Sequence, residues 1–243
     1  NFIRDRGAMA LAECLKVNKV LHTLNLSNNN ITNVGGVGLS NSLEVNSSLL
    51  ELNLDNNNLL GDEFAIEMGK VLQTNESLLA LLCSRCLIKK RGAIALAQVL
   101  ECNNTTLEVL SLGGNDIRTD GMIAMAKMLK KNNSSLKTLE IGTKNNIGRV
   151  GVLAVAKSIG SNTSLETLRL NDCIIGAQVL IALSRSLLRN ASLLRLELSS
   201  CAEENVGWHH VRHAIRMNTT LIELSGLERI ELALQTPQRS RMV

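Results

Sequence analysis

The stretch that decides the fold reads LHTLNLSNNNI and spans residues 21–31. Leu24 and Leu26 alternate with polar residues, which is the pattern of a short strand with one buried face and one face in water. Asn29 and Ile31 follow where such a strand ends, and an Asn side chain can satisfy the backbone groups of a buried turn. The stretch therefore predicts a short strand followed by an inward turn.

This stretch is repeated through the chain. Each copy opens with a leucine, and successive opening leucines are 28 or 29 residues apart. The opening leucines are Leu21, Leu49, Leu78, Leu107, Leu136, Leu165, Leu193 and Leu221. A fixed period of this length marks stacked repeats rather than a single globular core, so we expect neighbouring strands to be parallel.

A helix is predicted between successive strands. Apolar residues recur there at helical spacing, as in Met125 and Leu129. An asparagine closes each helical segment, and we expect it to adopt a left-handed capping conformation, which Asn tolerates better than most residues. These asparagines are Asn18, Asn46, Asn75, Asn103, Asn132, Asn162, Asn190 and Asn218.

Two further positions recur in most copies. The turn after the strand carries an Asn or a Cys, namely Asn29, Asn57, Cys86, Asn115, Cys173 and Cys201. The entry to the helix carries a glycine, where we expect a tight bend that a Cβ would oppose; these are Gly7, Gly35, Gly92, Gly121, Gly151 and Gly207. Phe64 and Val179 replace that glycine in two copies, so we expect a looser or differently packed entry there.

The motif LxxLxL, with its Asn or Cys, resembles the leucine-rich repeat family, and the 28/29-residue period resembles the ribonuclease-inhibitor-like subclass. The resemblance implies an α/β solenoid, a curved horseshoe segment of about seven to eight repeats with parallel strands on the concave face and helices on the convex face. We expect one solenoid over residues 1–234, beginning within a repeat, with an edge strand near Leu232 and a frayed tail at 235–243.

Composition excludes several functional classes. The net charge of +4 is too small to predict nucleic-acid binding, and the sequence contains no run of eighteen apolar residues that predicts a membrane span. Cys83 and Cys86 form a CxxC motif, but the first falls on an inward strand position and the second in the turn, so we expect both to be structural. Free buried cysteines indicate a reducing compartment, and we expect the cytoplasm.

Two motifs resemble chemical sites. Residues 151–158 read GVLAVAKS, which differs from a phosphate-binding loop at Ala156, but they fall within a predicted helix. His209 and His213 are four residues apart on another predicted helix, with Cys201 or Glu204 as a third candidate metal ligand, yet a change of packing near the array end accounts for them. We therefore expect no catalytic residues, no cofactor and no metal.

The remaining functional candidate is the concave surface. Residues two, four and six positions after each opening leucine should form columns on it. An apolar centre with a charged rim is typical of a protein contact site. The residues that we expect to bind a partner protein are Glu51, Asp55, Ala80, Leu82, Val109, Glu140, Arg169, Arg195 and Glu197.

The function favoured by this pattern is a non-enzymatic protein-interaction scaffold in a larger assembly. The resemblance to the ribonuclease-inhibitor-like subclass implies assemblies such as a cytoskeletal or ciliary one. One alternative is a GTPase-activating protein of the Ran activator type, because that family has a similar array; Lys89, Lys90, Arg91 and Arg118 would then be the candidate rim residues. A second is the ligand-sensing repeat region of a larger receptor. Nuclease inhibition is disfavoured because the columns carry neither a strong negative field nor aromatic anchors.

Overall fold

The computed structural model describes residues 2–131, 135–142, 145–199, 201–203 and 207–226. Helices alternate with short strands along this part of the chain. The helices are α1 (Arg4–Val17), α2 (Asn33–Ser42), α3 (Asp62–Val71), α4 (Lys90–Cys102), α5 (Arg118–Lys130), α6 (Arg149–Ser158), the 3-10 turn η1 (Ile159–Ser161), α7 (Ala177–Leu187) and α8 (Trp208–Met217). The strands are β1 (Thr23–Asn25), β2 (Glu51–Asn53), β3 (Ala80–Leu82), β4 (Val109–Ser111), β5 (Thr138–Glu140), β6 (Thr167–Arg169), β7 (Ile174–Ile175), β8 (Arg195–Glu197), β9 (Ala202–Glu203) and β10 (Glu223–Ser225).

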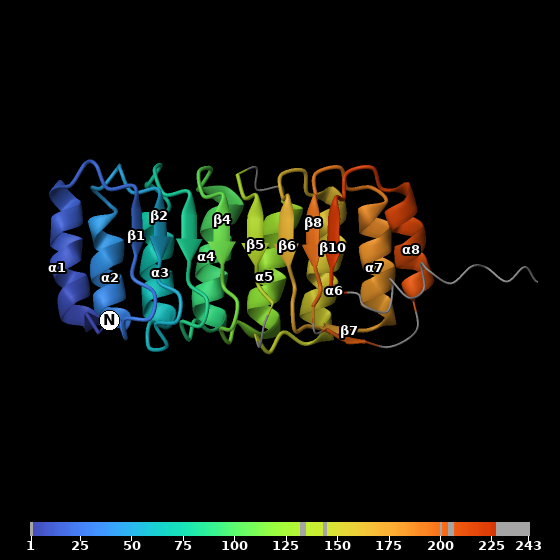
Figure 1. The fold of residues 1–243 in the computed structure, drawn as a ribbon, viewed down its shortest axis with the longest axis horizontal. Helices are drawn as coiled ribbons and strands as arrows, with labels where there is room; N and C mark the ends of the chain where they lie inside the picture. Colours follow the sequence, from blue (N-terminus) through green and yellow to red (C-terminus); the bar gives the residue numbers. More distant parts are fainter. Residues whose placement is uncertain (1, 132–134, 143–144, 200, 204–206, 227–243) are drawn as a thin grey trace, which may run out of the picture.

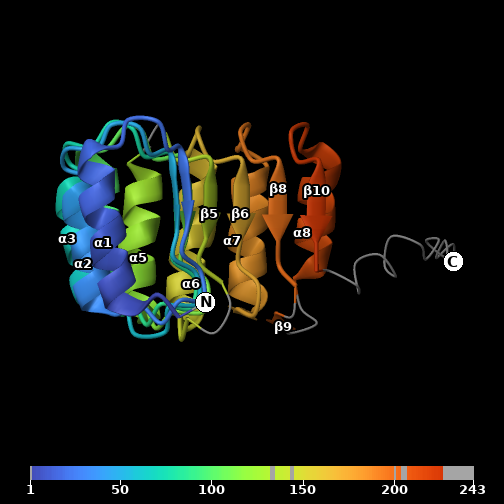
Figure 2. The same ribbon diagram turned by 60° about the vertical axis from the view of Figure 1, so that its left-hand side comes forward.

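The main sheet is parallel and follows the chain, in the order β1-β2-β3-β4-β5-β6-β8-β10. The strands form one layer and the helices a second layer behind it (Figure 1). The array bends so that the strands lie on its inner side and the helices on its outer side (Figure 2). The predicted α/β solenoid with parallel strands on the concave face is thus confirmed.

The core lies between these two layers and is built from equivalent residues of successive repeats. The middle residue of each strand is a leucine that pairs with the middle leucine of the next strand. The buried members of this row are Leu52, Leu81, Leu110, Leu139, Leu168 and Leu196. Since each repeat buries its apolar face only against its neighbours, the array is stabilised by a continuous aliphatic core rather than by separate cores.

Each strand begins two residues after the opening leucine, and an asparagine side chain explains why. In the second repeat, Asn46 Oδ1 accepts hydrogen bonds from the backbone N–H groups of Ser48 (3.1 Å) and Leu49 (2.8 Å). Its Nδ2 donates to the carbonyl oxygens of Leu15 (2.8 Å) and Asn18 (2.9 Å) in the preceding repeat. The amide of the opening leucine is therefore bound by this side chain and does not join the sheet.

The prediction of left-handed caps at these asparagines is wrong. Asn18 has φ −73° and ψ 129°, and Asn218 has φ −77° and ψ 132°, which is extended backbone. In the fourth repeat the bridging residue is Asn104 rather than Asn103: Asn104 Nδ2 donates to Leu72 O at 2.9 Å, whereas Asn103 is exposed. Asn132 lies outside the described residues. The helix-end asparagines thus link repeats through their side chains and need no unusual backbone conformation.

A second row of asparagines lies in the turns after the strands. Asn57 is completely buried and makes four hydrogen bonds: its Oδ1 accepts from the N–H groups of Asn29 and Ile31, and its Nδ2 donates to the carbonyls of Leu26 and Leu54. The predicted role of this position is confirmed for Asn57. In the fifth repeat the same role falls to a residue that the sequence pattern missed, Asn145, whose Nδ2 donates to Leu112, Ile141 and Gly142.

Gly207 has φ 114° at the entry to α8, so the predicted bend is confirmed there, whereas other recurring glycines allow neighbouring helices to approach one another. Gly92 lies in the first turn of α4, and a Cβ there would be 2.7 Å from the Cβ of Ala65 in α3. Where Phe64 replaces the glycine, Gly36 of the preceding helix provides the space, since a Cβ on it would be 2.9 Å from the Phe64 ring. Phe64 is fully buried, so its entry is differently packed but not looser. Val179 is also buried.

A short second sheet was not expected from the repeat pattern. It pairs β7 with β9 in parallel at the lower rim of the array, beside the turns (Figure 1). The expected edge strand near Leu232 and the expected tail at 235–243 lie outside the described residues. Within the described ranges, no helix is both long and apolar enough to cross a bilayer.

Candidate functional site

The inner surface of the sheet carries two columns of side chains in the register that the sequence predicts. The first column contains Thr23, Glu51, Ala80, Val109, Thr138, Thr167, Arg195 and Glu223. The second contains Asn25, Asn53, Leu82, Ser111, Glu140, Arg169, Glu197 and Ser225. Residues on alternate strand positions point to the same side of a sheet, so both columns face away from the helices.

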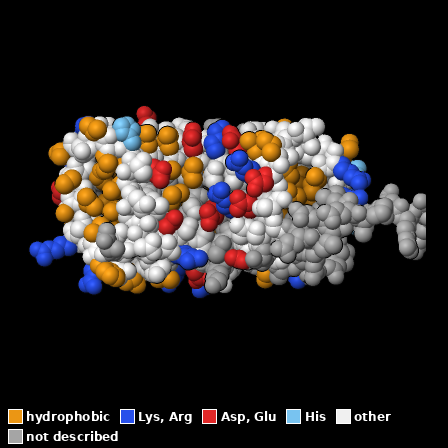
Figure 3. Space-filling model, viewed as in Figure 1, with side chains coloured by type: hydrophobic (Ala, Val, Ile, Leu, Met, Phe, Trp, Pro, Cys, Tyr) orange, Lys and Arg blue, Asp and Glu red, His pale blue; other side chains and the backbone are white. Residues whose placement is uncertain are grey.

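The centre of this surface is apolar. Ala80 lies opposite Val109 in the pairing of β3 with β4, and Leu82 lies on the same face two residues further along β3. All three side chains are half-buried and retain surface that a partner can contact. Figure 3 shows apolar side chains over this part of the sheet. We call Ala80, Leu82 and Val109 the apolar patch.

Two carboxylates lie on one side of the patch, and they differ in whether the described residues bind them. Glu51 pairs in register with Ala80 and is therefore the immediate neighbour of the patch on β2. Asp55 Oδ1 accepts a hydrogen bond from Ser84 N at 2.6 Å, so this carboxylate is used to hold the turn. Burial raises the pKa of Asp55, and the hydrogen bond from Ser84 opposes that shift. Glu51 is thus the better placed of the two to meet a partner.

The charges on the other side are largely paired with one another. Arg169 Nε lies 2.8 Å from Glu197 Oε1, and Arg195 Nε lies 3.1 Å from Glu223 Oε2. Basic and acidic side chains accordingly gather over β5 to β10 in Figure 3. Sequence reasoning omitted Glu223, although it stands two positions after Leu221 and so falls in the first column. These pairs reduce the charge that is available to a partner.

Glu140 differs from these paired residues. Its carboxylate lies across the neighbouring repeat, because a Cβ on Gly113 would be 2.6 Å from Glu140 Oε1. Among the residues that the structure describes, neither Glu140 nor Glu51 forms a salt bridge. The apolar patch is therefore flanked by an available carboxylate on each side, at β2 and at β5.

The candidate basic residues lie at the rim, where the chain enters α4 and α5. Lys90 Nζ is 3.5 Å from Asp120 Oδ2, and an Arg118 guanidinium nitrogen is 3.0 Å from Asp116 Oδ2. Lys90, Arg118 and Asp120 line an open depression of about 500 Å³. Arg118 is thus held at the rim by a carboxylate two residues before it and does not project freely.

The cysteines of the CxxC motif are buried, as expected. Cys83 and Cys86 each have 0% exposed surface, and Cys86 Sγ donates to Leu54 O at 3.1 Å, in the role that an Asn takes in other repeats. Burial raises the pKa of Cys86 to about 12 and raises that of Cys83 well above its usual value. Thiols with such pKa values are poor nucleophiles at neutral pH.

The remaining motifs fall where the repeat pattern predicts. Gly151 to Ser158 lie within α6, so their backbone amides are not arranged around a phosphate. His209 and His213 are exposed on α8, and Glu204 lies outside the described residues. In the portion of the chain that is described, no group of three or more His, Cys, Asp or Glu side chains is placed to hold a metal ion.

The fold and its side-chain rows define a class of protein, and comparison with known proteins agrees. A family model described as Leucine Rich repeat matches residues 17–40 and 103–126. The chain is a leucine-rich repeat protein. No curated protein matches the sequence.

Two solved structures illustrate the likeness. The tropomodulin C-terminal domain of Caenorhabditis elegans is 12% identical, with a TM-score of 0.52, over 63% of this chain and 90% of that chain. Leiomodin-1 actin-binding site 2 is 16% identical, with a TM-score of 0.46, over 84% of this chain and 94% of that chain. At 12% identity, the likeness to the tropomodulin domain shows a similar fold and nothing about function.

Proposed function

We propose that the protein is a non-enzymatic interaction scaffold that binds a partner protein through the inner face of its sheet, within a larger assembly such as a cytoskeletal or ciliary one. The observation that carries this proposal is the apolar patch, which combines half-exposed Ala80, Leu82 and Val109 at the centre of a regular sheet. Buried contacts at the centre of an interface contribute more to affinity than contacts at its rim.

The charges around the patch indicate the chemistry of the partner. Glu51 and Glu140 flank the patch without a salt bridge among the described residues, whereas Arg169 and Arg195 are already paired with carboxylates. An approaching side chain therefore meets an apolar centre between two carboxylates. We infer a partner segment that places an apolar residue between Lys or Arg side chains, since complementary charge favours both association rate and specificity.

The setting of the protein is part of the same proposal. Cys83, Cys86 and Cys173 are buried free thiols. Free buried thiols fit a reducing compartment, so we propose a cytoplasmic location. The 28/29-residue period supports assignment to the ribonuclease-inhibitor-like subclass, in which each repeat contains a strand and a full helix.

The experiment is cross-linking mass spectrometry in a native extract, followed by binding measurements with the purified partner. Leu82→Glu introduces a charge into the apolar patch and should weaken the partner's affinity at least about tenfold. Leu59→Glu is the matched control, because Leu59 is 59% exposed and lies outside both columns. If Leu82→Glu captures the partner as well as the control does, the proposed face is wrong.

The alternative of a Ran-type GTPase activator has less support. It requires a basic or polar group at the rim that can reach a nucleotide site, and Arg118 and Lys90 are both held in ion pairs. Incubation of the purified chain with a Ran-like GTPase tests it directly. An accelerated rate of GTP hydrolysis that Arg118→Ala abolishes would replace the scaffold proposal with this activity.

A further inference from the structure

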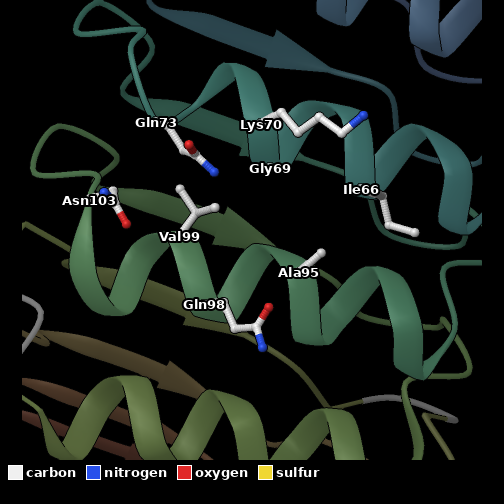
Figure 4. A pocket seen from close by; sticks show the side chains of 8 residues that line it. All are labelled: Ile66, Gly69, Lys70, Gln73, Ala95, Gln98, Val99 and Asn103. Atoms are coloured by element: carbon white, nitrogen blue, oxygen red, sulfur yellow. The ribbon is translucent and has the colours of Figure 1, made fainter.

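The outer, helical side of the array carries a groove between α6 and α7. Its volume is about 660 Å³, and it is lined by both helices, by η1 and by the end of α5. The corresponding groove between α3 and α4 measures about 190 Å³. In that groove, Val99 of α4 points toward α3 at Gly69 and fills the space (Figure 4). The groove between α6 and α7 thus leaves more room for a ligand than the groove between α3 and α4.

Beside the wider groove, α6 ends in a 3-10 turn. The α-helical hydrogen bonding stops at Ser158, and the chain continues as the 3-10 turn η1. The close contact with α7 is made at this turn, where a Cβ on Gly160 would be 3.2 Å from Ser186 Cα and Ser186 Oγ donates to Ala156 O at 2.6 Å. A tight contact at one end of the two helices therefore coexists with a groove between them.

The floor of the groove is apolar. Leu153 on α6 and Ile181 on α7 are half-buried, and Ala182 is 7% exposed. Leu153 also packs against the hydrophobic core. These side chains offer a recessed apolar surface to any group that enters from outside.

The rim of the groove is basic. Four exposed cations line it, and they are Lys130, Lys157, Arg185 and Arg189. No carboxylate lines the groove, and over the described residues none of the four cations forms a salt bridge. By contrast, Lys127 and Lys131 of the same neighbourhood both pair with Glu101. The groove thus concentrates positive charge that no carboxylate of the described residues neutralises through an ion pair.

We propose that this groove binds an acidic amphipathic helix of a partner protein, with apolar side chains on the floor and carboxylates against the four cations. The eleven residues of α7 extend about 16 Å, which matches a bound helix of three turns. Such a ligand uses both features of the groove, the recessed apolar floor and the basic rim. The groove lies on the opposite side of the molecule from the apolar patch, so the proposal does not depend on the function of the sheet.

Two other anionic partners fit the groove less well. A bilayer surface is broad and flat, whereas the apolar floor is recessed between two helices and does not protrude into a membrane. Single-stranded nucleic acid uses aromatic side chains for stacking, and the lining contains none. The cations alone would attract all three ligands; the floor distinguishes the peptide.

The test measures the binding of a fluorescein-labelled synthetic peptide of about sixteen residues, with Leu at every third or fourth position and Glu at the others, by fluorescence anisotropy. We expect binding that weakens as salt rises. The double variant Lys157→Glu with Arg185→Glu should weaken binding about tenfold or more, because it reverses two of the four rim charges.

The chain offers a matched control. Lys70 of α3 and Lys157 of α6 both stand twenty-one residues after their opening leucines, Leu49 and Leu136, and both are exposed. Lys70→Glu should leave peptide binding unchanged. Thermal unfolding followed by circular dichroism checks that all variants fold, which we expect since the altered side chains are on the surface.

Three outcomes would overturn the proposal. The first is equal peptide affinity for the double variant and for Lys70→Glu, or no binding by the parent chain. The second is equal affinity for a peptide in which every Leu is replaced by Ser, since this would show general attraction of a polyanion. The third is binding of phosphatidylserine vesicles that requires Lys157 and Arg185 when the peptide does not bind, which would assign the groove to a membrane surface.

Discussion

Replacing Asn57 by Ala tests whether the turn asparagines hold neighbouring repeats together. The change removes an amide that accepts hydrogen bonds at 3.2 and 2.9 Å and donates others at 3.0 and 2.7 Å. Because Asn57 is fully buried, the N–H groups of Asn29 and Ile31 and the carbonyl of Leu26 lose their partner without gaining bulk water, whereas Leu54 O keeps the hydrogen bond from Cys86 Sγ. At about 1 kcal/mol for each of these three groups, the free energy of unfolding should fall by about 3 kcal/mol.

The loss should be concentrated in the first repeats. Asn57 bonds to Asn29 and Ile31 of the preceding repeat, and stability in a repeat array is a sum of local and nearest-neighbour contributions. Urea unfolding followed by circular dichroism measures the total, while amide hydrogen exchange at β1 and β2 locates it. Asn57→Cys should cost less than Asn57→Ala, because Cys86 in the next repeat occupies the same position and donates to Leu54 O.

Asn58 provides the control for this prediction. It is adjacent in sequence but exposed, so Asn58→Ala should change the free energy of unfolding by less than about 0.5 kcal/mol. The reasoning is refuted if Asn57→Ala costs less than about 1 kcal/mol, or if hydrogen exchange accelerates equally throughout the array.

Three other predictions concern packing, reactivity and pH. Gly92→Ala should destabilise the protein by about 1 to 3 kcal/mol in urea unfolding, and adding Ala65→Gly should recover part of that loss, because the new Cβ would be 2.7 Å from Ala65 Cβ. Cys86 should react with Ellman's reagent only after unfolding, whereas the exposed cysteines of α1 and α4 should react at once; rapid reaction of Cys86 in the folded protein would contradict its burial. The hydrogen bond from Lys131 lowers the pKa of Glu101 from its usual 4.5, so the carboxylate stabilises the fold above that pH and loses this effect as pH falls through the lowered pKa. Glu101→Gln should accordingly be less stable than the parent at neutral pH and equal to it near about pH 2, as measured by thermal unfolding across that range.

The repeat pattern predicted the architecture because the pattern is redundant. Each opening leucine belongs to a series with one period, and an error at one repeat does not alter the register of the others. The pairing of Leu24 with Leu52, and of Glu51 with Ala80, follows once equivalent residues are aligned. The columns on the sheet could therefore be assigned from sequence spacing alone.

Single positions were less predictable where neighbouring residues compete for one role. Asn103 and Asn104 are adjacent, and only their spacing to Leu107 distinguishes them in the sequence. In the structure, Asn104 Oδ1 accepts the hydrogen bond from the N–H of this opening leucine, at 2.9 Å. Asn145 was missed because it stands nine residues after its opening leucine, Leu136, whereas the turn residues of the other repeats stand eight residues after theirs. The left-handed caps were wrong for a different reason: an Asn side chain can satisfy the turn by itself, so the backbone has no need of that conformation.

The sequence by itself determined the parallel order of the strands, the aliphatic core and the identity of the residues on each face, because all three follow from periodicity. Only the tertiary structure decided which of the surface charges are available. Arg169 and Glu197 are 28 residues apart and meet at 2.8 Å because their repeats stack, whereas the cations around the α6–α7 groove lack such a neighbour among the described residues. Pairing of charges depends on distances of a few ångströms between repeats, and spacing along the chain contains no information on that scale.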